Sequence, residues 1–314
     1  MEKTNNQSED KEELPGPECW ICGSKDNYKL WDSTANENLV PKDIAISNDK
    51  YGQSLNLYRC KNCTFTFAFP VPENIVDLYE DLVDELYIKS INARFKEMQH
   101  IIKHSLKLKP STKSVLDVGA GAGTLVKAAM DKNIEAAGVE PSKWLVEQAH
   151  KLFGVNLIQG IVPNDQLSGK KFDMVFAIDV IEHLSNPLEF LEYLKMYLND
   201  DGLIVIVTPD INSFAAKVLK KKWWHYRYAH INFFNKKSIT KAAEVSGLNV
   251  IKFKRHVWYL PFGYLVNRLC YYLPVKFISR FIEKSKKLSN LSIKFNFYDS
   301  LVIYLSKNQN HPSR

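Results

Sequence analysis

Short apolar runs alternate with helical segments from residue 114 onward, and this alternation constrains the fold more than any other feature of the chain. Because parallel strands need a long crossover between them, strand-helix alternation at this pitch predicts a parallel sheet with helices on both faces. In such sheets, ligands bind beyond the carboxyl ends of the strands. The expected strands span 114–118, 136–139, 155–159, 174–178, 203–207, 250–253 and 300–305, and the expected helices span 124–132, 144–152, 187–198 and 238–246.

A glycine-rich turn follows the first expected strand, in the order Asp117-Val118-Gly119-Ala120-Gly121-Ala122-Gly123. Small residues let the chain turn tightly and let its backbone approach a ligand. Glu140 ends the next strand, 23 residues after Asp117, where a carboxylate can accept hydrogen bonds from both ribose hydroxyls of an adenosine. The pattern indicates an adenosine-containing cofactor. A dinucleotide usually takes its third glycine three residues after the second, and a turn that only packs helix on strand is the other alternative.

Two further motifs follow at the fourth and fifth strands: Asp179-Val180-Ile181-Glu182-His183-Leu184, and a strand that ends at Thr208-Pro209. With the glycine turn and Gly138-Val139-Glu140-Pro141-Ser142, they resemble the class I S-adenosylmethionine-dependent methyltransferases, in particular the ubiquinone-biosynthesis O-methyltransferases and sugar methyltransferases. The resemblance covers about residues 19–250 and the final strand. It implies an α/β fold with a Rossmann-like seven-stranded sheet, helices on both faces, and a small zinc-binding β module in front.

This resemblance also implies how the cofactor binds. The glycine turn would lie under the methionine part of S-adenosylmethionine, Glu140 would take the ribose, and Asp179 would lie near the methionine amino group. The predicted cofactor-binding residues are Asp117, Gly119, Gly121, Gly123, Glu140 and Asp179.

Four of the five cysteines form two C-x-x-C pairs, Cys19 with Cys22 and Cys60 with Cys63. Four thiolates suit a closed tetrahedral Zn²⁺ site, which is structural because no coordination position stays open for a substrate. Two unrelated pairs are the alternative. A cysteine-headed subset of the same family also has a C-x-x-C before, and an R-C-x-x-C after, a variable loop. Cys270 is most simply a small hydrophobic residue.

Methyl transfer to a hydroxyl needs a base, and histidine titrates in the suitable range. His183 follows the fourth strand and His230 follows the fifth, so both are candidate catalytic residues. For His183, ordering of the strand-loop-helix turn is an equal alternative. In related sugar methyltransferases both positions line the substrate pocket, and glutamate often precedes the second, where this chain has Ala229. Aromatic residues near His230, including Trp224 and Tyr228, are candidates for the substrate pocket, with a packed lid as the alternative.

The predicted organisation places a methyltransferase domain at 111–257 and 296–308, and the other parts are a disordered tail (1–16), the zinc module (17–72), bridging helices (73–110) and an insertion (258–295). The chain carries a net charge of +7, but ten lysines and arginines and one acid lie between residues 251 and 294. Within 258–288, apolar and basic residues recur at helical spacing, which predicts an interfacial helical hairpin on an anionic membrane. A lid or a dimer element is the alternative reading.

These patterns predict an enzyme that methylates a hydroxyl of a small or lipid-linked substrate such as a sugar, with C- and N-methylation left open. The chain has no run of about 18 apolar residues and no secretory signal, so we expect a cytoplasmic protein, free or at the inner face of the membrane. An rRNA or tRNA methyltransferase is one rival, although residues 19–63 of the zinc module have six basic and five acidic residues, which is little charge for tracking phosphates. A zinc-scaffolded binding protein without activity is the other.

Overall fold

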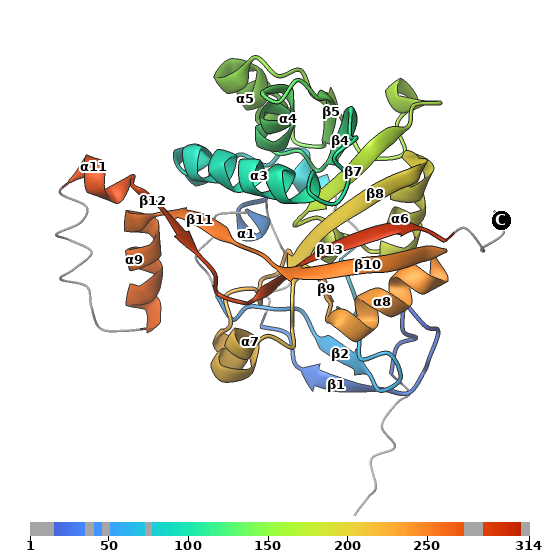
Figure 1. The fold of residues 1–314 in the computed structure, drawn as a ribbon. Helices are drawn as coiled ribbons and strands as arrows, with labels where there is room; N and C mark the ends of the chain where they lie inside the picture. The colour runs from blue at the N-terminus through green and yellow to red at the C-terminus, as the bar shows by residue number, and fades with distance from the viewer. Residues whose placement is uncertain (1–15, 35–40, 46–50, 73–76, 273–284, 309–314) are drawn as a thin grey trace, which may run out of the picture.

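A seven-stranded sheet forms the centre of the molecule (Figure 1). The computed structural model describes residues 16–34, 41–45, 51–72, 77–272 and 285–308. The strand order is β10-β13-β8-β7-β4-β5-β6. Its strands are β4 (Ser114–Val118), β5 (Glu135–Glu140), β6 (Ile158–Gln159), β7 (Phe172–Ile178), β8 (Leu198–Pro209), β10 (Leu248–Arg255) and β13 (Ser300–Lys307). The chain moves outward from β4 in one direction and then returns to β7, so the strand order reverses between them and a ligand crevice is expected there.

Helices cover both faces of this sheet, as predicted (Figure 1). A buried apolar cluster lies on each face of the sheet. Successive side chains of β4 point to opposite faces, so Val115 packs in one cluster and Leu116 in the other. One face carries α3 (Ile91–Ser105) and α4 (Thr124–Met130), and the other carries α6 (Pro187–Met196) and α8 (Lys236–Val245). Outside the insertion after β10, the other described helices and 3-10 turns are α1 (Pro41–Ile44), η2 (Asp77–Tyr79), α2 (Glu85–Lys89), α5 (Lys143–Phe153), η3 (Asp165–Leu167), η4 (Ile181–His183), α7 (Phe214–Leu219) and η5 (Lys220–Lys222).

Strand β13 departs from the predicted parallel arrangement. It lies between β8 and β10 and is antiparallel to both. The residues after β10 leave and return at the same end of the sheet, since Arg255 at the end of β10 pairs with Leu301 near the start of β13. An antiparallel return needs no helical crossover over the sheet, which is the physical reason for the difference.

The cysteine segment forms a second sheet with the order β1-β2-β3-β9. Three strands come from this segment, and the fourth comes from the loop after β8: β1 (Asn27–Trp31), β2 (Leu57–Cys60), β3 (Thr66–Ala68) and β9 (Asn232–Phe233). Phe65 and Phe67 pack in the same buried cluster as Phe234 and the helices α6 and α8. The cysteine segment therefore shares both a sheet and a core with the rest of the fold.

The insertion after β10 begins as a strand. Its elements are β11 (Trp258–Pro261), α9 (Phe262–Tyr272), α11 (Lys286–Ser289) and β12 (Ser292–Phe295). The predicted helical hairpin is thus wrong at its start, because Trp258 to Pro261 pair antiparallel with β12 and rest on α3. The middle of the predicted amphipathic segment, 273–284, lies outside the described residues. Within the described part of the chain, no helix combines the length and apolar character needed to cross a bilayer.

Candidate functional site

A cavity of about 430 Å³ opens at the carboxyl ends of β4, β5 and β7, where the strand order predicts a ligand. It collects most of the predicted site residues, which come from the glycine turn, the end of β5, the loop after β7 and the loop before β9. These residues are Asp117, Gly119, Gly121, Glu140, Asp179, His183, Trp224 and His230. The cavity therefore brings the predicted cofactor and catalytic groups together.

Two glycines of the turn form the cavity floor. Gly119 and Gly121 have φ of 75° and 54°, a left-handed backbone that side-chain-bearing residues rarely adopt. A Cβ at Gly119 would lie 2.6 Å from Val180 Cγ2, and a Cβ at Gly121 would collide with the Tyr87 hydroxyl. Gly123 has a different role, because it precedes α4 and packs against Ala149 rather than lining the cavity.

Glu140 is tied to this turn at the end of β5. Its Oε2 accepts a hydrogen bond from the Gly121 backbone N–H at 2.7 Å, and its Oε1 accepts one from the Ser142 backbone N–H at 3.0 Å. Each carboxylate oxygen has two lone pairs, so the pair of oxygens can still accept hydrogen bonds from two hydroxyls. Burial raises the pKa of Glu140 to about 7, and the two backbone donors oppose that rise.

Four buried polar atoms in the cavity wall have no hydrogen-bond partner among the described residues: Asp117 Oδ1, Asp179 Oδ1, Glu182 Oε1 and Arg94 Nε. Unpaired buried polar atoms are costly and rare, so their clustering in one cavity indicates a polar ligand. Burial raises the pKa of Asp117 to about 8, with a further contribution from the Glu140 charge, and burial raises that of Asp179 to about 6. Arg94 lies over the Tyr87 ring, with its guanidinium carbon 4.2 Å from the ring centroid.

The side chains of His183 and His230 lie next to each other, with ring centroids 4.8 Å apart. Nδ1 of His183 is 2.7 Å from the Ala229 carbonyl oxygen, and Nδ1 of His230 is 2.8 Å from the His225 carbonyl oxygen. Because a carbonyl only accepts, each Nδ1 carries the proton, which in His183 also faces the Tyr79 hydroxyl oxygen at 2.8 Å, and each Nε2 has a lone pair. Burial lowers the pKa of His183 to about 4 and that of His230 well below its usual range. Both rings are therefore neutral at pH 7, and each presents an unprotonated Nε2.

Glu182 adds a third group to this histidine pair. One ligand atom from each of Glu182, His183 and His230 lies within 4.8 Å of the others, close enough to share one cation. Oε2 of Glu182 accepts a hydrogen bond from Thr208 at 3.0 Å, whereas Oε1 is buried without a described partner. Burial and the nearby Asp179 raise the pKa of Glu182 well above its usual value. The cluster can thus supply either a proton acceptor or the ligands of a divalent cation.

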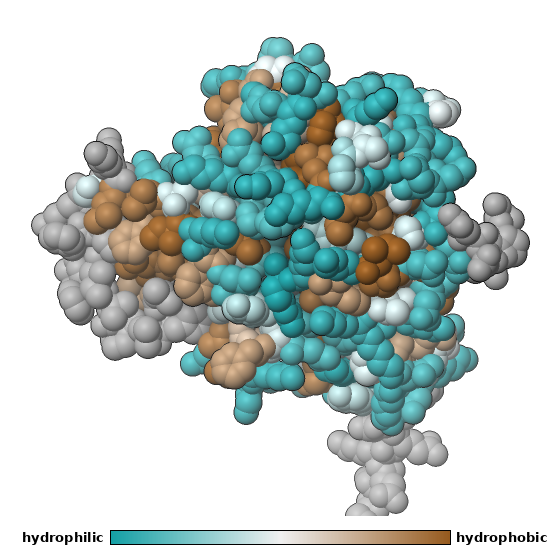
Figure 2. All heavy atoms as spheres, viewed as in Figure 1, coloured by the Kyte–Doolittle hydropathy of each residue, from teal (hydrophilic) through white to brown (hydrophobic). Residues whose placement is uncertain are grey.

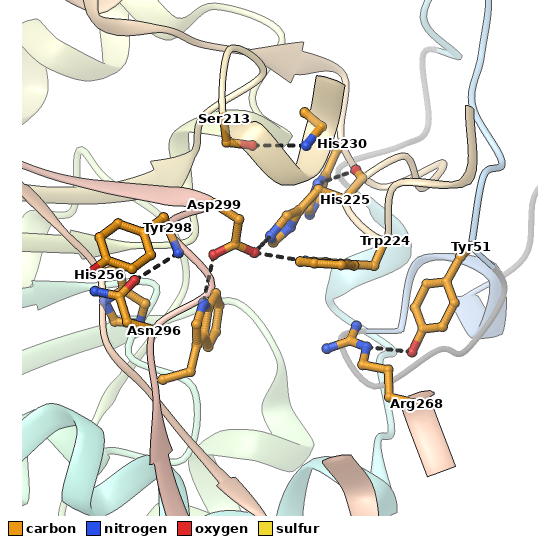
Figure 3. A network of polar contacts seen from close by, with 12 residues as sticks. Tyr51, Ser213, Trp224, His225, His230, His256, Arg268, Asn296, Tyr298 and Asp299 are labelled. Carbon is orange, nitrogen blue, oxygen red and sulfur yellow. Dashed lines mark hydrogen bonds and ion pairs between the residues drawn. The ribbon is translucent and has the colours of Figure 1, made fainter. Parts of the chain in front are cut away.

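Asp299, directly before β13, holds three side chains that line the cavity (Figure 3). Its Oδ2 accepts hydrogen bonds from Trp224 Nε1 at 2.8 Å and His225 Nε2 at 3.0 Å, and its Oδ1 accepts one from Trp258 Nε1 at 3.0 Å. Burial alone would raise the pKa of Asp299, but these three bonds lower it. Trp224 lines the cavity as predicted, whereas Tyr228 points elsewhere and donates to the Thr34 carbonyl oxygen at 2.7 Å.

A family model described as a methyltransferase domain matches residues 91–252, which is just over half of the chain. This chain belongs to the methyltransferase family. The matched residues contain the glycine turn, Glu140, Asp179 and both histidines. The resemblance to the class I S-adenosylmethionine-dependent methyltransferases is thereby confirmed.

The methyltransferase is similar to curated proteins that act on different atoms. The "Probable (S)-tetrahydroprotoberberine N-methyltransferase 2" of Papaver bracteatum is 28% identical over 164 residues, which are 50% of this chain and 39% of that protein. The ubiquinone biosynthesis O-methyltransferase of Azorhizobium caulinodans is 27% identical over 126 residues, which are 37% of this chain and 50% of that protein. The matched region thus spans half or less of these relatives.

Among solved structures, an S-adenosylmethionine-dependent methyltransferase of Clostridium acetobutylicum is similar at 12% identity and a TM-score of 0.46. The similarity covers 71% of this chain and 96% of that one.

The four cysteines of the methyltransferase lie together at the end of β2, whose last residue is Cys60. The Sγ atoms of Cys19 and Cys63 are 3.5 Å apart, those of Cys22 and Cys60 are 3.6 Å apart, and all four lie within 4.8 Å of one another. A tetrahedral Zn²⁺ with Zn–S bonds of about 2.3 Å separates its sulfurs by roughly 3.8 Å. The four thiols therefore fit a structural zinc ion.

Two residues of the site carried no signal that the sequence patterns could reveal. Arg94 is one of several charged positions on the amphipathic helix α3, and no motif marks it. Asp299 lies after the insertion, directly before β13 and about 120 residues from the β7 motif, and the pairing of β13 with β8 brings it to the cavity.

Proposed function

We propose that this protein transfers a methyl group from S-adenosylmethionine to a hydroxyl of a small acceptor such as a sugar. The observation that carries the proposal is the cavity itself, where unpaired buried donors and acceptors lie beside two neutral histidines. The unpaired donors and acceptors suit a zwitterionic nucleoside cofactor, and the histidines suit a hydroxyl that must lose a proton.

The residues around the glycine turn offer hydrogen-bonding groups for the ribose, the ammonium and the carboxylate of the cofactor. Glu140 would accept hydrogen bonds from the ribose hydroxyls, since both of its oxygens are already aimed by backbone donors. Asp179 would accept from the methionine ammonium, and Arg94 would donate from Nε to the methionine carboxylate. The bound cofactor supplies an electrophilic methyl group on a sulfonium.

His230 would act as the general base. Its Nε2 lone pair would take the acceptor's hydroxyl proton while the oxygen forms its bond to the methyl carbon and the sulfonium bond breaks, leaving a neutral thioether. His183, whose Nε2 is also unprotonated, would hold the acceptor by a second hydrogen bond. The enzyme then contributes position and a proton acceptor, which is what displacement at an already activated carbon requires.

The four thiolates would hold a structural Zn²⁺. Phe65, two residues after Cys63, packs on Phe234 beside β9, so the metal would stabilise the loop that carries His230. This role involves no open coordination position and no step of the reaction.

Calorimetric titration with S-adenosylmethionine tests the cofactor claim. We expect saturable binding by the wild-type protein, and a loss of about tenfold or more in affinity for Glu140→Ala, because two hydrogen bonds to a charged group are removed. A wild-type protein that releases no heat would favour the rival of a zinc-scaffolded binding protein without activity.

The acceptor class is tested with radiolabelled cofactor and separated cell fractions that contain nucleotide sugars, lipids or RNA. We expect label in a sugar or lipid fraction. Incorporation into RNA alone would favour the rival rRNA or tRNA methyltransferase instead.

A further inference from the structure

The carboxylate of Asp299 lies in a rigid part of the fold. Its side chain is fully buried, and it directly precedes β13, which pairs with β8 on one side and with β10 on the other. Its backbone carbonyl oxygen accepts a hydrogen bond from the Asp210 backbone N–H at 2.8 Å. A group held on the strands of a sheet keeps its position more precisely than one on a loop. Asp299 is therefore a fixed point to which a neighbouring loop can be anchored.

Two consecutive residues of the loop between β8 and β9 bind the same oxygen of Asp299. Oδ2 accepts hydrogen bonds from Trp224 Nε1 at 2.8 Å and from His225 Nε2 at 3.0 Å (Figure 3). The residue after them is held as well, because the Tyr226 carbonyl oxygen accepts a hydrogen bond from the Gln53 backbone N–H at 3.1 Å. With both side chains and the following carbonyl bonded, the backbone of His225 keeps one direction.

The backbone carbonyl of His225 determines where His230 carries its proton. The His225 oxygen lies 2.8 Å from His230 Nδ1, so this nitrogen donates and Nε2 keeps its lone pair. A neutral imidazole in water prefers the opposite tautomer, with the proton on Nε2. The tautomer that suits a general base at Nε2 thus depends on this one carbonyl oxygen.

The His225 ring has the reverse tautomer. Because a carboxylate only accepts, its Nε2 carries the proton that is donated to Asp299. Burial lowers the pKa of His225, although the Asp299 charge opposes the decrease, so the ring is neutral at pH 7. The rings of His225 and His230 are stacked with centroids 5.8 Å apart. Two adjacent neutral histidines therefore hold their protons on opposite nitrogens.

We propose that Asp299 is a positioning residue for methyl transfer, which acts through His225 to hold His230 in the tautomer that can take the acceptor's proton. This inference rests on the proposed function. Asp299 lies behind Trp224 and His225, which line the cavity. Without the carboxylate, the His225 Nε2–H loses its acceptor and the His225 carbonyl is free to turn. His230 then returns to the tautomer with a protonated Nε2, which cannot act as the base.

The first test determines the tautomers by NMR of the full-length protein, with its histidine nitrogens isotopically labelled and with saturating S-adenosylhomocysteine. We expect His230 to carry its proton on Nδ1 and His225 to carry its proton on Nε2, with His230→Ala and His225→Ala assigning the signals. In Asp299→Ala, the His230 proton should move to Nε2. Asp299→Asn retains one oxygen and should give a smaller change.

Asp173→Asn is the matched control for both Asp299 variants. The Asp173 carboxylate also accepts several hydrogen bonds, from the Lys113 and Ser114 backbone N–H groups and from Asn199 Nδ2. It lies at the amino end of β7, whereas the cavity opens at the carboxyl ends of the strands. We expect this variant to leave both tautomers unchanged.

The second test measures the initial rate at which a radiolabelled methyl group enters the cell fraction that accepts it. Asp299→Ala should lower this rate about tenfold or more, with unchanged affinity for S-adenosylhomocysteine, because the base is in the wrong tautomer. In a His230→Ala background, the same substitution should change the rate by less than about twofold, since residues that act on one step are not additive. A purely structural role of Asp299 would lower the rate equally in both backgrounds.

The proposal is overturned if wild-type His230 carries its proton on Nε2, if Asp299→Ala leaves that proton on Nδ1, or if the rate falls equally in both backgrounds. The wild-type spectrum needs no substitution, so it is decisive even where Asp299→Ala does not fold. Label uptake by a protein whose His230 has a protonated Nε2 would refute this inference alone. The expected tautomers without label uptake into any fraction would refute the proposed function.

Discussion

The two histidines that face the cavity owe their proton-accepting state to backbone carbonyls. Each Nδ1 is held by a carbonyl oxygen, of Ala229 for His183 and of His225 for His230. The sequence patterns identified both histidines as candidates but could not assign their tautomers. That assignment depends on where the loop between β8 and β9 places its carbonyls, which is a property of the tertiary structure.

Replacement of His230 by alanine should lower kcat by about 100-fold or more and leave cofactor affinity unchanged, because a general base contributes about this much. The wild-type rate should be flat between pH 6 and 8 rather than rise near 6.5, since burial keeps both histidines neutral there. His150→Ala, an exposed histidine on α5, is the control. Retained activity in His230→Ala would rule out the base role. If EDTA instead abolishes activity and a divalent cation restores it, the cluster of Glu182, His183 and His230 binds a metal.

Asp117 should make the stability of the cofactor-free protein fall as pH rises. Burial raises its pKa to about 8 in the folded state, so the folded chain retains a proton that the unfolded chain releases above about pH 4. The free energy of unfolding should therefore decrease between about pH 4 and 8. Asp117→Asn should flatten this decrease, on the order of 2 to 5 kcal/mol across the window. Urea denaturation at several pH values measures it, and identical pH profiles for variant and wild type would contradict the assignment.

At the scale of elements, the cysteine sheet supports the loop that carries His230. The Ala68 backbone N–H donates to the Ile231 carbonyl oxygen at 2.8 Å, and the Ile231 N–H donates to the Glu182 carbonyl oxygen at 2.9 Å. A chain of backbone bonds thus connects β3 to the residue after His230 and on to the β7 motif. Among the described residues, we find no backbone hydrogen bond that connects β4 or β5 to the cysteine sheet.

Cys60→Ser should therefore lower turnover more than it lowers cofactor binding. We also expect it to reduce the zinc content from one ion per chain and to reduce the free energy of unfolding by on the order of several kcal/mol, because structural zinc binding contributes directly to folding. Metal analysis, thermal melting and calorimetry measure the three effects. Cys270→Ser, in α9, is the matched control. Wild-type protein purified without zinc yet equally stable and active would contradict the structural role.

Elements with strong local signals were predictable, and short pairings between distant segments were not. Strand β4 spans the predicted residues 114–118, since the apolar residues Val115, Leu116 and Val118 directly precede a glycine turn. By contrast, β9 has two residues, which pair with β3 residues 165 and 167 positions away, and β11 pairs with β12 residues 31 to 37 positions away. Such pairings depend on contacts formed after the sheet assembles, and neither hydrophobic periodicity nor residue propensity encodes them.

At the scale of the whole molecule, the insertion links the cavity to an exposed apolar surface. Its residues Trp258 and Arg268 line the cavity. Figure 2 shows apolar side chains gathered over the region of α9 and β11, where Leu291 and Phe295 are 54% and 44% exposed. A membrane-bound acceptor would therefore meet the enzyme at the element that completes its binding pocket.

From this arrangement we predict that the protein sediments with vesicles of mixed phosphatidylcholine and phosphatidylserine, and less with phosphatidylcholine alone. The basic residues of 251–294 attract the anionic surface, and the apolar side chains enter the interface. Binding should weaken in 0.5 M salt, where the Debye length falls to about 4 Å. Leu291→Ser with Phe295→Ser should reduce sedimentation about tenfold, whereas Val245→Ser, equally exposed on α8 but distant in sequence, should not. Absence of the wild-type protein from the anionic pellet at low salt would leave the insertion as a lid or dimer element.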